Sequence, residues 1–248
     1  MQRRRSFHPL AIALIATIAW VALPGAATAQ GAGAGEGRPF STLVLSTGAT
    51  LMSVDAINAR LIPAGFAGLS NDAITYGASG YVAIGRGLLG AELGRSTYGE
   101  EGLNNGRTDD LNSRFAMATA GYALYASHHL SVFPQLGVGA GTVDVTLRNR
   151  AGTATATPQP TFDEVAQAPG PESTLSGRHL LFSVGVGADY LVLPAAASEW
   201  GVVFGVRGGV LVAPNRTTWS RSGSDVGAGP DGAPEGPFLR VVVGVGHR

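Results

Sequence analysis

The chain has 248 residues, with 17 basic and 17 acidic side chains and no cysteine. The balanced charge offers no basic surface of the kind that nucleic-acid-binding proteins carry, so no nucleic-acid partner is expected, and the lack of cysteine excludes disulfide bonds and thiol chemistry. The length suits a single all-β domain.

The amino-terminal segment, residues 1–29, has the features of a cleaved export signal. Three arginines at 3–5 precede an apolar run at 10–23, and small residues at 27–29 form a signal-peptidase site. The apolar run is shorter than the roughly 20 residues of a membrane-spanning helix, which disfavours an uncleaved anchor. We therefore predict a signal peptide over 1–29, a short linker over 30–40 and one domain over 41–248. Cleavage would remove three arginines and no acid, leaving a mildly acidic chain.

Eight later segments alternate their side chains with the period of two that is typical of β-strands, and they are rich in β-branched and aromatic residues. In chain order they cover 41–51, 74–85, 88–98, 113–125, 129–148, 179–193, 200–213 and a last strand from 237. Within 129–148 the apolar residues move from even to odd positions, which predicts a β-bulge near 139–142.

The last three strands show which chemistry each face carries. Trp200, Val202 and Phe204 share one face, whereas Gly201 and Gly205 lie on the other. A water-soluble barrel places bulky side chains inside and polar ones outside, but here the inner face of a narrow barrel suits the small residues. We therefore expect the bulky face to point outward against lipid. The alternative is a soluble exported barrel of the lipocalin kind, with the bulky face inward around a small apolar ligand.

The connections alternate strictly in length. Those at 86–87, 126–128 and 194–199 are short, and those at 52–73, 99–112, 149–178 and 214–236 are long. In bacterial outer-membrane barrels, short turns face the periplasm and long loops face the exterior.

Two of the long loops have recognisable content. In 52–73, Ser53 is expected to cap a short helix that places Val54, Ile57 and Leu61 on one side and ends at Pro63. The loop at 149–178 is expected to be a mobile, polar and poorly ordered excursion. These two loops are the possible surfaces for extracellular contacts.

Taken together, the chain resembles the small eight-stranded outer-membrane barrels of Gram-negative bacteria, of the OmpA-like or OmpX-like type, over residues 41–248. The stretch at 77–95, GASGYVAIGRGLLGAELGR, is similar to the glycine-rich hairpins of that group. The resemblance implies an antiparallel up-and-down transmembrane β-barrel in the outer membrane. Outer-membrane lipid and the barrel assembly machinery would then be its partners. The carboxyl end, Gly246-His247-Arg248, lacks the terminal aromatic residue that is common in the group.

Four charged residues are expected to project into the barrel. They are Glu92, Asp189, Arg207 and Arg240. Because an unpaired charge in a poorly solvated interior is costly, they should pair. The favoured interpretation is a structural plug, since eight strands leave little free bore. A narrow gated pore is the alternative.

Aromatic residues near the strand ends are interpreted as girdles at the two water–lipid boundaries. The expected members are Tyr98, Phe115, Tyr125, Tyr190, Trp200 and Trp219. Ordinary strand propensity is the alternative explanation for them.

The sequence favours a protein that is not an enzyme, and no cofactor or metal is expected. Acids at 100–101 and 109–110 share a loop but lack the spacing of a calcium site. His179 and Ser183 share a strand face, but four strand residues separate them by roughly 13 Å, beyond hydrogen-bond reach.

Overall fold

The computed structural model describes residues 39–98, 101–102, 107–149, 161–194, 198–214, 217–232 and 235–248. The predicted export signal at 1–29 and most of the predicted linker at 30–40 lie outside the described residues.

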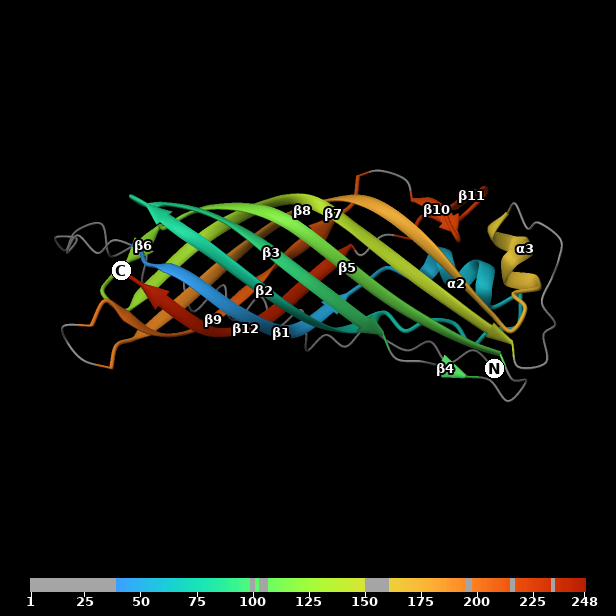
Figure 1. The fold of residues 1–248 in the computed structure, drawn as a ribbon, viewed down its shortest axis with the longest axis horizontal. Coiled ribbons are helices and arrows are strands. Elements are labelled where there is room, and N and C mark those ends of the chain that lie inside the picture. The colour runs from blue at the N-terminus through green and yellow to red at the C-terminus, as the bar shows by residue number, and fades with distance from the viewer. Residues whose placement is uncertain are drawn as a thin grey trace.

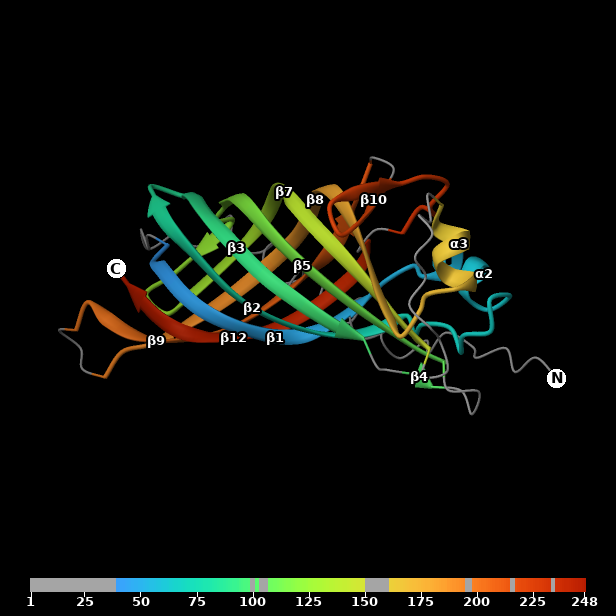
Figure 2. The same cartoon turned by 45° about the vertical axis from the view of Figure 1, so that its right-hand side comes forward.

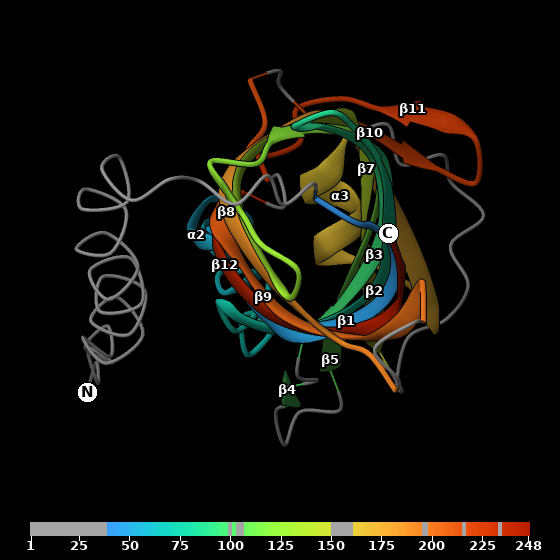
Figure 3. The same cartoon turned by 90° about the vertical axis from the view of Figure 1, so that its left-hand side faces the viewer.

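Eight antiparallel strands close into a barrel, as the sequence predicted (Figure 1). Each strand pairs with the next one along the chain, and the last pairs with the first from Ser41 opposite His247 to Thr50 opposite Phe238. In the view along the barrel the ring is complete (Figure 3). The ring strands are β1 (Ser41–Leu51), β2 (Asp72–Ile84), β3 (Gly87–Tyr98), β5 (Arg107–Tyr122), β7 (Leu130–Asn149), β8 (Glu172–Val192), β9 (Trp200–Val212) and β12 (Gly236–His247).

Short strands and helices lie at the two ends of the ring. Near the short turns, β6 (Tyr125–Ala126) pairs with β7. At the long-loop end, β4 (Glu101–Gly102) pairs with β5, and β10 (Thr218–Arg221) joins β8 to β11 (Ser224–Val226). The helices α2 (Asp55–Leu61) and α3 (Phe162–Gln167) lie together at this same end (Figure 2).

The outer surface of the barrel carries a belt of exposed apolar side chains. Val184, Val202, Phe204 and Val241 are all between 44 and 58% exposed, so the predicted outward direction of the bulky face is confirmed. Every ring strand contributes small or bulky apolar residues to this belt. Its larger members include Leu43, Leu45, Ile74, Val82, Ile84, Leu89, Leu93, Leu136, Val138, Leu180, Phe182, Val186, Val210, Val243 and Val245.

Towards the long-loop end the polarity of the two faces is inverted. On β7, Val138 points outward, whereas Val143, Val145 and Leu147 point inward and are fully buried. The pairing of β7 with β5 and β8 runs without a break through this region, so the predicted bulge is wrong. The backbone continues regularly. The apolar residues change face because the inward positions of β7 at this end pack in one core with the two helices.

The inversion also explains why two strands begin earlier than predicted. β5 begins at Arg107 and β8 at Glu172, in segments that the sequence predicted as loops. In these extensions Leu111 and Leu175 point inward and are fully buried. A search for outward apolar residues therefore misses them.

The inward residues of the extensions form an apolar cap with the two helices. Ile57 and Leu61 of α2 are buried as predicted, but the helix cap at Val54 has no side-chain hydrogen bond, so Ser53 is not the cap. In α3, Thr161 and Glu164 form a capping box and Phe162, Val165 and Ala166 are buried. The prediction of a poorly ordered excursion at 149–178 is therefore wrong for 162–167 and 172–178, which are helix and strand, while 150–160 lie outside the described residues.

Within the ring outline, α3 lies across the far end of the bore (Figure 3). The cap comprises Met52, Val54, Ile57, Leu61, Phe66, Leu69, Ala73, Tyr98, Leu111, Val143, Val145, Leu147, Phe162, Val165, Ala166, Leu175, Trp219 and Val226. The long-loop end of the barrel is thus closed by a core of its own.

Candidate functional site

The interior of the barrel is filled in layers, beginning at the short-turn end. Phe40, just before β1, is buried against Val44, Leu191, Val203 and Val242. The last residue of the predicted linker is therefore part of the core. It closes the bore at the end where the chain enters the ring.

The next layer holds the first ion pair, between Asp189 of β8 and Arg207 of β9. The guanidinium donates two hydrogen bonds to the carboxylate, one of them from Nη2 to Oδ2 at 2.8 Å. The Tyr81 hydroxyl donates to the same carboxylate. The Arg207 guanidinium also lies 5.0 Å from the centre of the Phe133 ring, and that ring meets Tyr81 edge to face. Bidentate pairing and aromatic contacts both suit a buried guanidinium.

A second ion pair crosses the bore. Arg240 of β12 donates to Glu92 of β3, although β1 and β2 separate these strands in the ring. The Arg240 guanidinium lies 4.4 Å from the centre of the Phe238 ring and 5.0 Å from that of Phe115. Both charged side chains are buried. This contact ties two parts of the ring that share no backbone hydrogen bonds.

The remaining inward residues continue the filling towards the cap. Thr50, Thr75 and Ser96 form a buried row of hydroxyls, joined at 2.9 and 2.7 Å. An apolar group accompanies the second ion pair, consisting of Phe115, Met117, Leu181, Leu211 and Phe238. From the short turns to the cap, the interior therefore holds an apolar layer, the first ion pair, the second ion pair with its apolar neighbours, and the hydroxyl row.

All four charges expected in the lumen lie inside the barrel, where they form two pairs with separate aromatic neighbours. The sequence interpretation missed Tyr81 as the hydrogen-bond donor to Asp189. It also missed the rings of Phe133 and Phe238 as partners of the arginines. The alternation of inward and outward positions around Tyr81 is the signal that identifies it as an interior residue.

Of the six residues predicted to form aromatic girdles, only the three near the short turns are exposed. Tyr125, Tyr190 and Trp200 are exposed near the short turns, and Trp200 packs against His247 with 4.6 Å between ring centres. Tyr98, Phe115 and Trp219 are 3, 6 and 1% exposed, so their assignment to an outer girdle is wrong.

The reason is that these three side chains occupy inward positions. Trp219 packs edge to face on Phe162 in the cap, and its indole Nε1 donates to the carbonyl of Pro230 at 2.8 Å. Phe115 lies beside Arg240, and Tyr98 belongs to the cap. On the outer face at the same level, β3 and β5 carry Arg95 and Arg114.

The acidic loop residues and the His179–Ser183 pair, both considered from the sequence, form no shared site among the described residues. Asp109 is buried while Asp110 accepts a hydrogen bond from Asn112 at 2.9 Å, and the side chains at 100 and 101 lie outside the described residues. His179 and Ser183 both point inward, and the imidazole Nδ1 of His179 lies 3.4 Å from the Thr217 hydroxyl. In the part of the chain that is described, no three histidine or acidic side chains gather as a metal site would require.

No helix among the described residues is long and apolar enough to cross a membrane. No family model and no curated protein matches the chain. Among solved structures, a major outer membrane protein from Thermus thermophilus is similar, with a TM-score of 0.43 and 12% sequence identity. That alignment covers 84% of this chain and 98% of the other.

Proposed function

We propose that the protein is an integral outer-membrane β-barrel with a closed interior and a structural or surface-interaction role. The observation that carries this proposal is the belt of exposed apolar side chains around the ring. Soluble monomers rarely expose continuous apolar surface on this scale, because each large apolar side chain forgoes about 1.5–3 kcal/mol of burial. Lipid removes that penalty.

The height of the belt agrees with this proposal. On β8 the outward apolar residues extend from Leu180 to Val192. At about 3.3 Å per residue they span roughly 40 Å along the strand. A strand tilt of about 40° reduces this to roughly 30 Å across the bilayer, close to the apolar band of about 25 Å in outer-membrane barrels.

The two alternatives fit the interior less well. A lipocalin-like barrel needs an inward apolar cavity for its ligand, whereas the middle of this bore holds Asp189, Arg207, Glu92 and Arg240 in ion pairs. A gated pore would need both ion pairs to separate and the apolar cap to move. The proposal therefore includes a barrel that does not conduct.

Insertion by the barrel assembly machinery, with the long-loop end outside the cell, completes the proposal. The outer ends of α2 and α3 would then face the medium, where Arg60 and Asp163 form an exposed ion pair at 2.7 Å. This surface, from the loops at 52–73 and 149–178, is the one available for extracellular contacts.

The location is tested by fractionation of cells that express the full chain. The protein should sediment with the outer membrane and require detergent for release. Recovery from the soluble periplasmic fraction would refute the proposal.

The orientation is tested with single cysteines, because the natural chain has none. Ser224→Cys in β11 and Arg86→Cys in the β2–β3 turn are both at exposed positions. A large membrane-impermeant maleimide should label Ser224→Cys on intact cells, and Arg86→Cys only after the outer membrane is permeabilised. The reverse pattern would contradict the orientation.

A further inference from the structure

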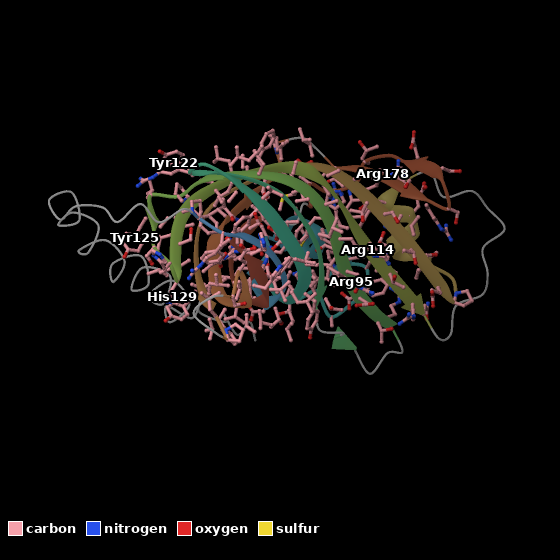
Figure 4. All side chains as sticks on the ribbon, turned by 60° about the vertical axis from the view of Figure 1, so that its left-hand side comes forward. Arg95, Arg114, Tyr122, Tyr125, His129 and Arg178 are labelled. Atoms are coloured by element: carbon pink, nitrogen blue, oxygen red, sulfur yellow. The ribbon has the colours of Figure 1, made fainter. Side chains whose placement is uncertain are left out.

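A row of arginines crosses the outer face of the barrel where the apolar belt ends. Arg95 of β3 pairs in register with Arg114 of β5, Arg114 with Thr142 of β7, and Thr142 with Arg178 of β8. All three arginines are exposed. With strands about 4.8 Å apart, the three guanidiniums originate within roughly 15 Å of one another. Figure 4 shows them on one side of the barrel, away from Tyr122, Tyr125 and His129 at the other end.

This arrangement places three positive charges on the outer face beside one carboxylate, that of Asp144, two positions along β7 from Thr142. Like charges on directly opposed residues of neighbouring strands are destabilising. Arg95 donates to the side-chain oxygen of Asn112 at 3.1 Å, a neutral partner. Within the described part of the chain, the guanidinium groups of Arg114 and Arg178 have no hydrogen-bond or ion-pair partner. The Asp144 carboxylate accepts from the Ser176 hydroxyl at 2.6 Å and forms no ion pair with the row, so it offsets one of the three charges at most. An external anion would relieve the remaining repulsion.

Between Arg114 and Arg178 the surface is hollowed. A shallow depression of about 320 Å³ lies there, with Ala116, Ala140 and Gly141 among its lining residues. The outward positions next to it towards the short turns are apolar, among them Val138, Leu180 and Phe182. A molecule with its anionic group at the arginines can therefore lay an acyl chain in the depression and along the belt.

The row also lies at the level where the outer face changes from apolar to polar. Leu93, Ala116 and Leu180 flank it on the side of the belt, whereas Thr97, Asn112 and Ser176 flank it on the side of the cap. If the barrel spans the outer membrane as proposed, this level is that of the head groups of the outer leaflet. Tyr76 of β2, directly opposite Arg95, is exposed at the same level, as an aromatic residue at a head-group boundary would be.

We propose that Arg95, Arg114 and Arg178, together with the depression beside them, bind a phosphate-bearing, acylated lipid of the outer leaflet. Guanidinium groups recognise phosphate through paired, charge-assisted hydrogen bonds, and three of them suit a head group with more than one phosphate. Arg114 and Arg178 hold the head group. The small residues between them accept one chain. This inference rests on the proposed function, because it places the row within a bilayer.

The test is native mass spectrometry of the detergent-purified barrel titrated with diphosphoryl lipid A, with phosphatidylethanolamine as the comparison lipid. Wild type should bind the diphosphoryl lipid at least tenfold more tightly than phosphatidylethanolamine. The double variant Arg114→Gln/Arg178→Gln should lose most of that preference. Arg86→Gln removes an exposed arginine from the short-turn end and should bind as wild type does. Ala140→Trp, which fills the depression, should also weaken binding while the arginines remain.

Three results would overturn the site. They are equal binding by wild type and the double variant, no preference over phosphatidylethanolamine, or equal loss in Arg86→Gln. A dimer that Ala140→Trp abolishes whether or not lipid A is present would identify the depression as a contact between two copies. The same preparations are fractionated in parallel. Membrane-bound protein without a lipid preference refutes the site alone, whereas soluble protein refutes the site and the proposed function together.

Discussion

The ion pair across the bore should be one of the most sensitive points of the barrel. Replacing Arg240 with methionine leaves Glu92 buried without its partner and removes the guanidinium from between the Phe115 and Phe238 rings. Breaking a buried ion pair in this way costs about 3–5 kcal/mol. Because both side chains are nearly inaccessible to solvent, water cannot replace the lost partner. We expect the free energy of unfolding of Arg240→Met to fall by that amount.

A double variant identifies the cause of this loss. Arg240→Met/Glu92→Leu removes both charges and keeps similar volumes, so it should be more stable than Arg240→Met alone. Arg148→Met is the matched control, because Arg148 pairs with Glu172 at 2.9 Å in an exposed position, where an ion pair contributes about 0–1 kcal/mol. Urea unfolding in detergent micelles, followed by circular dichroism, measures all four proteins. If Arg240→Met is no less stable than Arg148→Met, the reasoning about the buried pair is wrong.

Three further tests probe the filling of the bore and the cap. Gly94→Ala places a methyl group against the Phe115 ring and should lower the free energy of unfolding by about 1–3 kcal/mol. Gly208→Ala is the control, because the nearest atom to its added methyl group is 3.6 Å away. Equal unfolding midpoints for the two variants would argue against this packing. Thr161→Ala removes the capping box of α3 and should cost about 1 kcal/mol locally, seen as faster hydrogen exchange over 162–167 with unchanged exchange in β2; uniform exchange changes would contradict a local effect. Wild type in planar bilayers should show no conductance steps, because two ion pairs and the cap fill the bore; regular single-channel steps would favour the gated pore instead.

The belt and the strand order were predictable because each depends on local alternation. Val202 and Phe204 alternate with small residues over a whole strand, so the sequence alone indicates their face. The same criterion fails at Leu111 and Leu175, where the alternation continues but the apolar side has moved inward. Tyr98, Phe115 and Trp219 were misassigned for a related reason, since nearness to a strand end was read without regard to face.

The charges of the interior were predictable as a set, but their pairing was not. Alternation places Glu92 and Arg240 on inner faces, yet the contact between them depends on how far the strands are staggered around the ring. This stagger is set when the whole sheet closes, so the sequence of a single strand does not reveal it. The arginine row on the outer face has the same origin, because Arg95, Arg114 and Arg178 align only once the registers are known.

The inverted part of β7 limits how the long-loop end of this protein can be altered. The segment between β7 and β8 carries α3, whose buried residues pack in the same core as Val143, Val145 and Leu147. Replacing this segment with a foreign loop would remove α3 and leave those three side chains uncovered. Peptide display is better attempted at the hairpin tip of Ser222 and Gly223, where both residues adopt left-handed backbone conformations and are exposed. Display scaffolds built on this barrel would keep the apolar cap intact and vary only that tip.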